Sequence, residues 1–181
     1  YNYCTIGNAD VAAHWDNDRK SFFLDADIVN PEGQHSRIWG DIFPLSESLD
    51  LNFDARHVKV GFMKPFMAAF TSDVSGFVSG TARLFGTLKD IDMTGDVYAD
   101  DLRLKIDFTN TTYSASDSIH IRPGRIELHD ITLHDINGHT AMLNGVLTHD
   151  YFHLPKFDFR ITDARDFLSY NVTSKLNPDW Y

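Results

Sequence analysis

Apolar and polar side chains alternate with a period of two along most of this 181-residue chain. The clearest segment is 102–108, in which four apolar residues alternate with Arg103, Lys105 and Asp107. Successive side chains of a β-strand point to opposite faces of its sheet, so this pattern predicts a strand with one apolar face and one charged face. The same alternation recurs at 22–28, 49–55, 126–128, 131–133 and 157–161.

Turn-forming residues separate these segments. Gly, Pro, Asn and Asp favour tight reversals because of their backbone conformations and their short side-chain hydrogen bonds. Asn137-Gly138 lies between two short apolar runs and predicts a type I′ hairpin turn. The spacing of these turns predicts roughly ten to thirteen strands of ~5–8 residues. The other predicted turns are 30–33, 73–76, 94–96 and 122–125.

One segment has a helical period instead. Apolar residues occupy positions 62, 63, 66, 67 and 70, which is the stripe of an amphipathic helix. Pro65 suits the first turn of such a helix, where an N–H group has no intrahelical partner. We therefore expect one short helix over 62–70 that packs on the apolar face of the sheet. A second, weaker helix is predicted over 10–15.

Together these patterns predict a mainly β fold: a curled, antiparallel, meandering sheet, open or half-closed, with one short helix. A β-sandwich is the alternative, because the pattern does not show whether two apolar sheet faces meet. A faint internal repeat, in which a glycine and an aliphatic residue precede an alternating strand, occurs at 40–55, 86–108 and 145–161. It fits a stack of hairpins, none of which covers its own apolar face. We expect residues 1–181 to form a single β-rich segment.

The composition is acidic and apolar. Sixteen Lys and Arg residues against 26 Asp and Glu give a net charge of −10. This balance argues against nucleic acid as a partner, which needs a basic patch. A hydrophobic fraction of 43% is too high for a disordered chain. The single cysteine, Cys4, excludes an internal disulfide. The chain opens without Met, so we expect a piece cut from a longer protein.

A stretch rich in His and Asp, 129–153, is the strongest candidate for chemistry, because imidazole and carboxylate groups bind metals and transfer protons. However, His129 and His134 are five residues apart and point to opposite faces of a strand unless a bulge intervenes. We interpret these histidines as exposed and hydrogen-bonded. A glycine-rich phosphate loop and a Gly-x-Ser-x-Gly motif are both absent from the sequence. The sequence therefore predicts no enzyme, no catalytic residue, no metal and no cofactor.

The order of several loose motifs resembles that of TamB-like proteins, in the form found in the Bacteroides group. The resemblance spans about residues 38–170 and departs at 89–92, where the family usually has a proline. The segments that carry it are 70–76, 80–88, 93–97, 119–122, 126–128, 133–139, 143–149 and 157–159.

TamB is the large subunit of the translocation and assembly module, in the AsmA-like group. The resemblance implies a segment of the periplasm or cell envelope, with the full-length protein anchored in the inner membrane. It also implies a tapered, curled β-sheet with an apolar interior (a β-taco) and a C-terminal end that meets an Omp85-type outer-membrane barrel.

On this basis we expect a non-enzymatic component of outer-membrane biogenesis. Its hydrophobic trough would shield phospholipid acyl chains, or nascent outer-membrane protein segments, in transit between the two membranes. The alternative function is a secreted or surface β-sandwich that binds glycan or protein ligands through Trp15, Trp39, Trp180 and Tyr181. The residues expected to line the groove are Leu102, Leu104, Ile106, Phe108, Ile126, Leu128, Leu133, Leu143, Phe157, Phe159 and Ile161.

Overall fold

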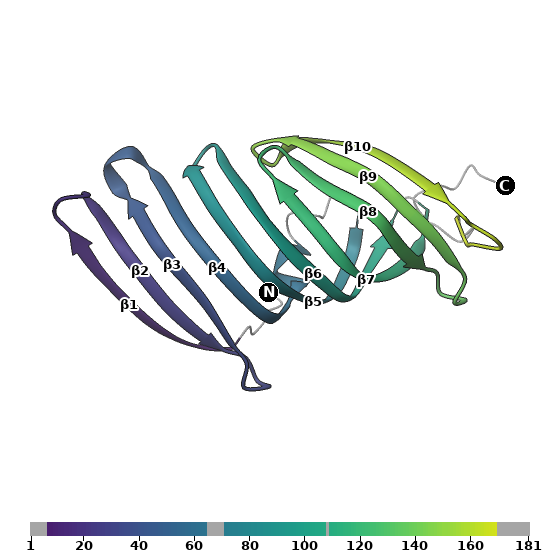
Figure 1. The fold of residues 1–181 in the computed structure, drawn as a ribbon, viewed down its shortest axis with the longest axis horizontal. Helices are drawn as coiled ribbons and strands as arrows, with labels where there is room; N and C mark the ends of the chain where they lie inside the picture. Colours follow the sequence, from purple (N-terminus) through teal and green to yellow (C-terminus); the bar gives the residue numbers. More distant parts are fainter. Residues whose placement is uncertain (1–6, 65–70, 108, 170–181) are drawn as a thin grey trace.

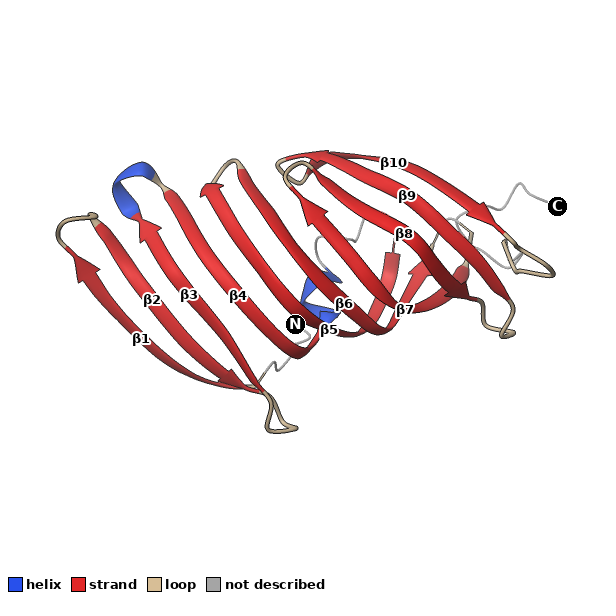
Figure 2. Cartoon of the chain, viewed as in Figure 1, coloured by secondary structure: helices blue, strands red, loops and turns tan. Residues whose placement is uncertain are grey.

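A computed structural model describes residues 7–64, 71–107 and 109–169. Within these ranges the chain forms ten strands and two short 3₁₀ helices, η1 at Pro44–Ser46 and η2 at Val60–Met63 (Figures 1 and 2). The strands are β1 Asn8–Asp16, β2 Ser21–Val29, β3 His35–Phe43, β4 Ser48–Lys59, β5 Thr71–Thr87, β6 Ile91–Ile106, β7 Thr111–Arg122, β8 Arg125–His134, β9 Thr140–Asp150 and β10 His153–Thr162.

All ten strands belong to one open sheet, in which each strand pairs antiparallel with the next along the chain. The prediction of a mainly β, antiparallel meander is confirmed. The β-sandwich alternative is wrong for the described residues, which form a single sheet with no second sheet packed on it. Figure 1 shows β1 and β10 at opposite ends of the long axis of the molecule, and among the described residues they are the two edge strands of the sheet.

The strands are longer than predicted, from 9 residues in β1 to 17 in β5. In β4, β6 and β8, two alternating runs are joined within one strand by a β-bulge. In β6, for example, the run that ends at Ala99 and the run that begins at Leu102 belong to the same strand. A bulge shifts the alternation by one residue without ending the strand.

The weak helix predicted over 10–15 is wrong, because these residues belong to β1. Every residue of β1 pairs with a residue of β2, from Asn8 opposite Val29 to Asp16 opposite Ser21. Pairing along the whole strand outweighs the helical propensity of Ala12 and Ala13.

The helix predicted over 62–70 is not confirmed. Its described part belongs to η2, a 3₁₀ helix, and 65–70 lie outside the described residues. The predicted type I′ turn is also wrong, because Gly138 has a positive φ of 85° and Asn137 does not. Instead, the Asp135 carboxylate organises a longer loop by accepting hydrogen bonds from the N–H groups of Asn137 (2.8 Å) and His139 (2.9 Å).

Three β-bulges have the same backbone geometry and the same pattern of hydrogen bonding. In β4, β6 and β8, two residues face a single residue of the next strand. The second of the two has a positive φ in each case: 51° at His57, 45° at Asp101 and 52° at Asp130. Its N–H donates to a side-chain oxygen of the facing residue, at 2.8 to 2.9 Å. These acceptors are Ser79 Oγ for His57, Ser116 Oγ for Asp101 and Asn144 Oδ1 for Asp130.

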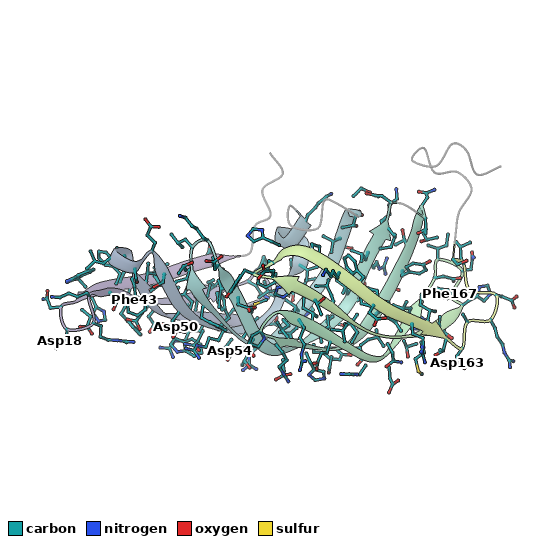
Figure 3. All side chains as sticks on the ribbon, turned by 90° about the horizontal axis from the view of Figure 1, so that it is seen from above. Asp18, Phe43, Asp50, Asp54, Asp163 and Phe167 are labelled. Carbon is teal, nitrogen blue, oxygen red and sulfur yellow. The ribbon has the colours of Figure 1, made fainter. Side chains whose placement is uncertain are left out.

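The bulges coincide with a bend in the sheet. Bulges increase the local twist and bend the strand that carries them. Figure 1 shows β5, β6 and β7 running along the front of the molecule, bending, and continuing behind it. In Figure 3, seen from above, the portions of these strands beyond the bend project away from the rest of the sheet. In β5, Gly76 lies at the bend with a φ of 116°, and a Cβ atom there would lie 2.5 Å from the Asp101 carbonyl oxygen.

Candidate binding surface

Strand register places the predicted groove residues on one face of the sheet, hereafter the apolar face. Ile126 and Phe157 both lie opposite Leu147, and Leu143 lies opposite both Ile131 and Ile161. Phe108 lies outside the described residues. The remaining predicted residues, which all lie on this face, are Leu102, Leu104, Ile106, Ile126, Leu128, Leu133, Leu143, Phe157, Phe159 and Ile161.

The apolar face continues over β1–β5, which the predicted set did not include. Direct cross-strand pairs extend it across four strands: Phe22 opposite Ile42, Ile42 opposite Leu49, and Leu51 opposite Leu84. The alternation at 22–28 and 49–55 was a sufficient signal for including these strands. At the β1 edge, Trp15 packs edge-on against Phe22, with ring centroids 4.8 Å apart.

Much of this face remains open to solvent. Leu102, Leu104 and Leu128 are half-buried rather than buried. Exposure is greatest toward the two edges of the sheet, where it reaches 56% at Val11 and 50% at Ile161. A soluble domain rarely leaves so large a contiguous apolar surface exposed without a binding role.

Two short segments cover part of the face near β5–β9. Val60 of η2 is buried, as is Val74 on the neighbouring β5. The segment 163–168 folds back over β7, where Phe167 stacks on Tyr113 with centroids 5.1 Å apart. Phe167 is labelled in Figure 3 near the β10 end of the molecule. Leu168 is held at both backbone groups: its carbonyl oxygen accepts the Tyr113 hydroxyl (2.9 Å), and its N–H donates to Asp135 Oδ2 (2.8 Å).

The opposite face, hereafter the charged face, carries several ion pairs between side chains of adjacent strands. Arg37 donates to both carboxylate oxygens of Asp25 at 2.9 and 2.7 Å, and Arg83 donates to both oxygens of Asp50 at 2.6 and 2.7 Å. These bidentate hydrogen bonds lower the pKa of each carboxyl below its usual value of 3.8.

His120 and Arg122 share Asp96 on the charged face, with distances from Asp96 Oδ1 of 2.6 and 2.9 Å. Their hydrogen bonds, that of His120 first, lower the pKa of the Asp96 carboxyl. Ion pairs of this kind neutralise part of the charge on the charged face, and their side chains remain partly exposed to solvent.

The histidines of 129–153 take structural positions. The bulge in β8 places His129 and His134 on the same face, because it shifts the alternation between Leu128 and Ile131. His129 Nε2 lies 3.7 Å from Glu127 Oε2, and His139 Nδ1 lies 3.3 Å from Asp135 Oδ2. In the described ranges, no three His, Cys, Asp or Glu side chains are close enough together to hold a metal ion.

His149 is the buried member of this group. Its Nδ1 accepts the N–H of Phe152 at 3.0 Å, and the two rings stack with centroids 4.3 Å apart. Its Nε2 is buried and has no hydrogen-bond partner in the described part of the chain. This ring closes the end of the apolar face at the β9–β10 turn.

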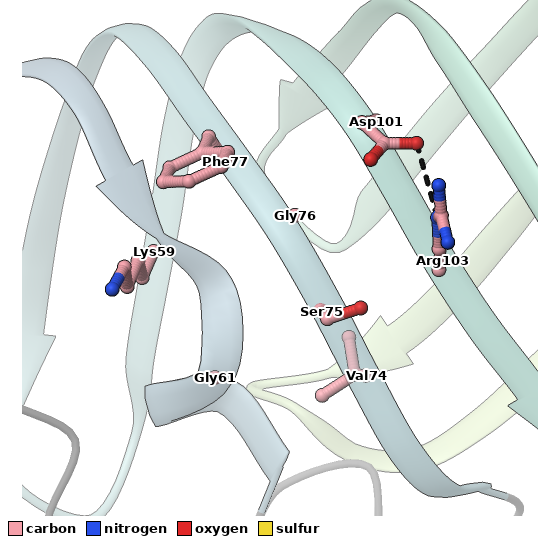
Figure 4. A pocket seen from close by; sticks show the side chains of 8 residues that line it. All are labelled: Lys59, Gly61, Val74, Ser75, Gly76, Phe77, Asp101 and Arg103. Atoms are coloured by element: carbon pink, nitrogen blue, oxygen red, sulfur yellow. Dashed lines mark hydrogen bonds and ion pairs between the residues drawn. The ribbon is translucent and has the colours of Figure 1, made fainter.

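A depression of 390 Å³ lies at the bend between the end of β4, η2, β5 and β6 (Figure 4). Its walls carry Lys59, Phe77 and Arg103, and Arg103 Nε lies 3.1 Å from Asp101 Oδ1. This arrangement places one ion pair at the rim and gives no pair of groups suited to nucleophilic or acid–base catalysis.

The two described aromatic residues of the alternative, glycan-binding hypothesis lie on opposite faces of the sheet. Trp15 lies on the apolar face beside Phe22. Trp39 lies on the charged face, where the Arg37 guanidinium stacks 5.2 Å above it. Trp180 and Tyr181 lie outside the described residues.

Comparisons with known proteins give no relative: no family model, curated protein or solved structure matches this chain. Among the helices of the described residues, none has the length and apolar character required to span a bilayer.

Proposed function

We propose that this chain is a non-enzymatic, periplasmic component of outer-membrane biogenesis that shields phospholipid acyl chains on its apolar face. The observation that carries the proposal is the asymmetry of the sheet. One face joins apolar residues from all ten strands, many of them half-buried or exposed, while the other carries cross-strand ion pairs. The resemblance to TamB-like proteins supports the same function.

The physical basis is burial of hydrocarbon. Each CH₂ group removed from water contributes ~0.8 kcal/mol, so a dozen methylenes on this face gain several kcal/mol. Ten strands at a spacing of ~4.8 Å give the sheet a contour of about 43 Å across the strands. Because the contacts are apolar and non-directional, neighbouring positions have similar energies, and a chain can slide from one to the next.

The wider setting is proposed on the resemblance. It comprises an inner-membrane anchor in the full-length protein and an Omp85-type barrel as the partner at the outer membrane. Phospholipid is the cargo that we propose. A nascent outer-membrane protein strand is the other cargo that an apolar sheet face with open edges can receive.

Two adjacent phenylalanines provide a matched test. Phe22 lies on the apolar face and is 45% exposed, whereas Phe23 lies on the charged face beside His14. The delipidated chain is titrated with a phospholipid that carries a fluorescent acyl chain. We expect Phe22→Glu to weaken binding about tenfold, since it places a charge in the path of the hydrocarbon. Phe23→Glu should leave binding unchanged.

Three outcomes would count against the proposal: no lipid binding by the wild-type chain, equal effects of the two variants, or binding of an unfolded outer-membrane protein in preference to lipid. Circular dichroism of both variants establishes that each is folded before binding is compared.

A further inference from the structure

Several charged side chains on the two edge strands form no ion pair within the described residues. Inside the sheet, a basic residue on one strand meets an acidic residue on the next, as in Arg37 with Asp25 and Arg83 with Asp50. In the described ranges, Lys156 and Arg160 of β10 form no ion pair, and neither does Asp10 of β1.

We propose that β10 of one molecule pairs antiparallel with β1 of a second copy, which continues the sheet and its apolar face from one molecule to the next. The even number of strands permits this antiparallel pairing. In a meander of ten strands, β1 and β10 run in opposite directions, so two molecules in the same orientation present antiparallel edges.

One register brings all the side chains into agreement. With Lys156 opposite Asp16 of the second copy, Asp158 lies opposite His14, and Arg160 lies diagonal to Asp10. The apolar faces then coincide, because Phe157 lies opposite Trp15, Phe159 opposite Ala13 and Ile161 opposite Val11. Opposite charges and aromatic residues on facing strands each stabilise a strand pair.

Neighbouring registers are less favourable. A shift of two residues in one direction places Asp158 against Asp16, which is a repulsive pair. A shift of two in the other direction places Arg160 directly opposite Asp10, but it separates Lys156 from Asp16 and Phe157 from Trp15, so it keeps one of these favourable pairs and loses two. A shift of one residue is excluded because it would turn the apolar side chains of one strand to the charged face of the other.

The exposed apolar residues of the two edges supply the driving force. Val11 and Trp15 are 56% and 39% exposed, and Phe157, Phe159 and Ile161 are 49%, 43% and 50% exposed. Unpaired edge strands of this kind are templates for association unless they are blocked. Because the contact joins two different edges, it is open-ended and predicts a concentration-dependent series of species rather than a closed dimer.

Cysteine trapping tests the proposed register. In a Cys4→Ser background, one preparation carries Ala13→Cys and the other carries Phe159→Cys, two positions that face each other in the proposed pair. Mild oxidation of the mixture should give a disulfide-linked dimer of twice the 20.6 kDa chain mass. The control replaces Ala13→Cys with Ala12→Cys, which points to the other face and should give about tenfold less dimer.

Sedimentation velocity provides a second measurement on the chain without added cysteines. Association should increase with concentration and weaken in Lys156→Glu. Lys89→Glu, in the β5–β6 turn, should associate as the wild type does. Equal trapping in the two cysteine pairs, or a folded wild-type chain that stays monomeric up to near-millimolar concentration, would overturn the proposal.

Discussion

The first four strands and the five strands β5–β9 present the same alternation of apolar and polar residues, yet they bury their apolar side chains to different depths. In β1–β3, Val11, Phe22 and Ile42 are 56%, 45% and 37% exposed, and Ala26, at 5%, is the one buried apolar side chain described in these strands. In β8 and β9, Ile131 and Ala141 are 5% and 3% exposed. The difference shows that alternation alone determines which face is apolar, while burial of that face requires additional features.

Those features are the bulges and the covering segments. β1, β2 and β3 pair with one another in continuous register, whereas bulges occur in β4, at the boundary between the two regions, and in β6 and β8 of the second region. The segments that cover the face, η2 and 163–168, pack on this second region. The β5–β9 region therefore holds most of the buried apolar side chains, and the apolar face of β1–β4 is half-buried or exposed except at Ala26.

The largest expected effect separates two alanines on the apolar face. Ala141 is buried in β9, while Ala13 is exposed in β1. Ala141→Glu should lower the free energy of unfolding by about 3–5 kcal/mol, because it buries a charge without a partner. Ala13→Glu should change it by no more than about 0.5 kcal/mol.

Urea denaturation of the two alanine variants and the wild-type chain measures both effects. Similar destabilisation by both substitutions would show that the two regions are equally buried in solution, and the comparison would fail.

The next effect concerns the bulge in β6. The Asp101 N–H donates to Ser116 Oγ at 2.9 Å, and this side-chain hydrogen bond takes the place of a regular backbone hydrogen bond at the bulge. Ser116→Ala should cost about 1 kcal/mol in unfolding free energy, because this backbone donor loses its acceptor. Ser118 lies two residues along the same face of β7, so Ser118→Ala is the matched control and should be nearly neutral.

Hydrogen exchange at Asp101 provides a direct readout. Its amide should exchange faster in Ser116→Ala and at the wild-type rate in Ser118→Ala. If the two variants exchange alike, the serine hydroxyl does not stabilise the bulge.

The sequence predicts those features of the fold that depend on neighbouring residues in the chain, and not those that depend on contacts between distant residues. Alternation is local, so the identity of the apolar-face residues in β6, β8 and β10 was predictable residue by residue. The bulges were not predicted, since their position depends on cross-strand partners: the Asp130 N–H donates to Asn144 on the adjacent strand, fourteen residues later in the chain.

The hydrophobic pattern of the sequence also did not predict that the segment 163–168 covers the apolar face at β7. Phe167 and Leu168 carry no alternation with their neighbours, and their position depends on Tyr113, more than fifty residues earlier. Long-range contacts of this kind leave no periodic signal in the segment that makes them.

A third prediction concerns the attachment of this segment at low pH. Burial raises the pKa of the Asp135 carboxyl, but the N–H groups of Leu168, His139 and Asn137 outweigh that effect, and the pKa lies below the usual 3.8. The stabilisation by the carboxylate is therefore fully present above that usual value. It is lost as the pH falls through the lower, folded-state pKa.

We expect the Leu168 amide to exchange faster as the pH drops below about 4, relative to intrinsic rates. Tyr113→Phe should loosen the segment by a similar small amount at every pH, since it removes only the hydrogen bond to the Leu168 carbonyl oxygen. An Asp135→Asn variant that retains the acid-induced loosening would show that another group is responsible.

The smallest effect is expected on the charged face, where the two regions are alike. Arg37 in β3 and Arg83 in β5 make the same bidentate bond to an aspartate of the preceding strand. Exposed pairs of this kind contribute little and are screened by salt. Arg37→Gln and Arg83→Gln should therefore destabilise the chain equally, by less than Ser116→Ala, and the loss should shrink in high salt. A larger, salt-insensitive loss in Arg83→Gln alone would mean that the bend buries the charged face of β5 as well, and that the contrast between the two regions is not confined to the apolar face.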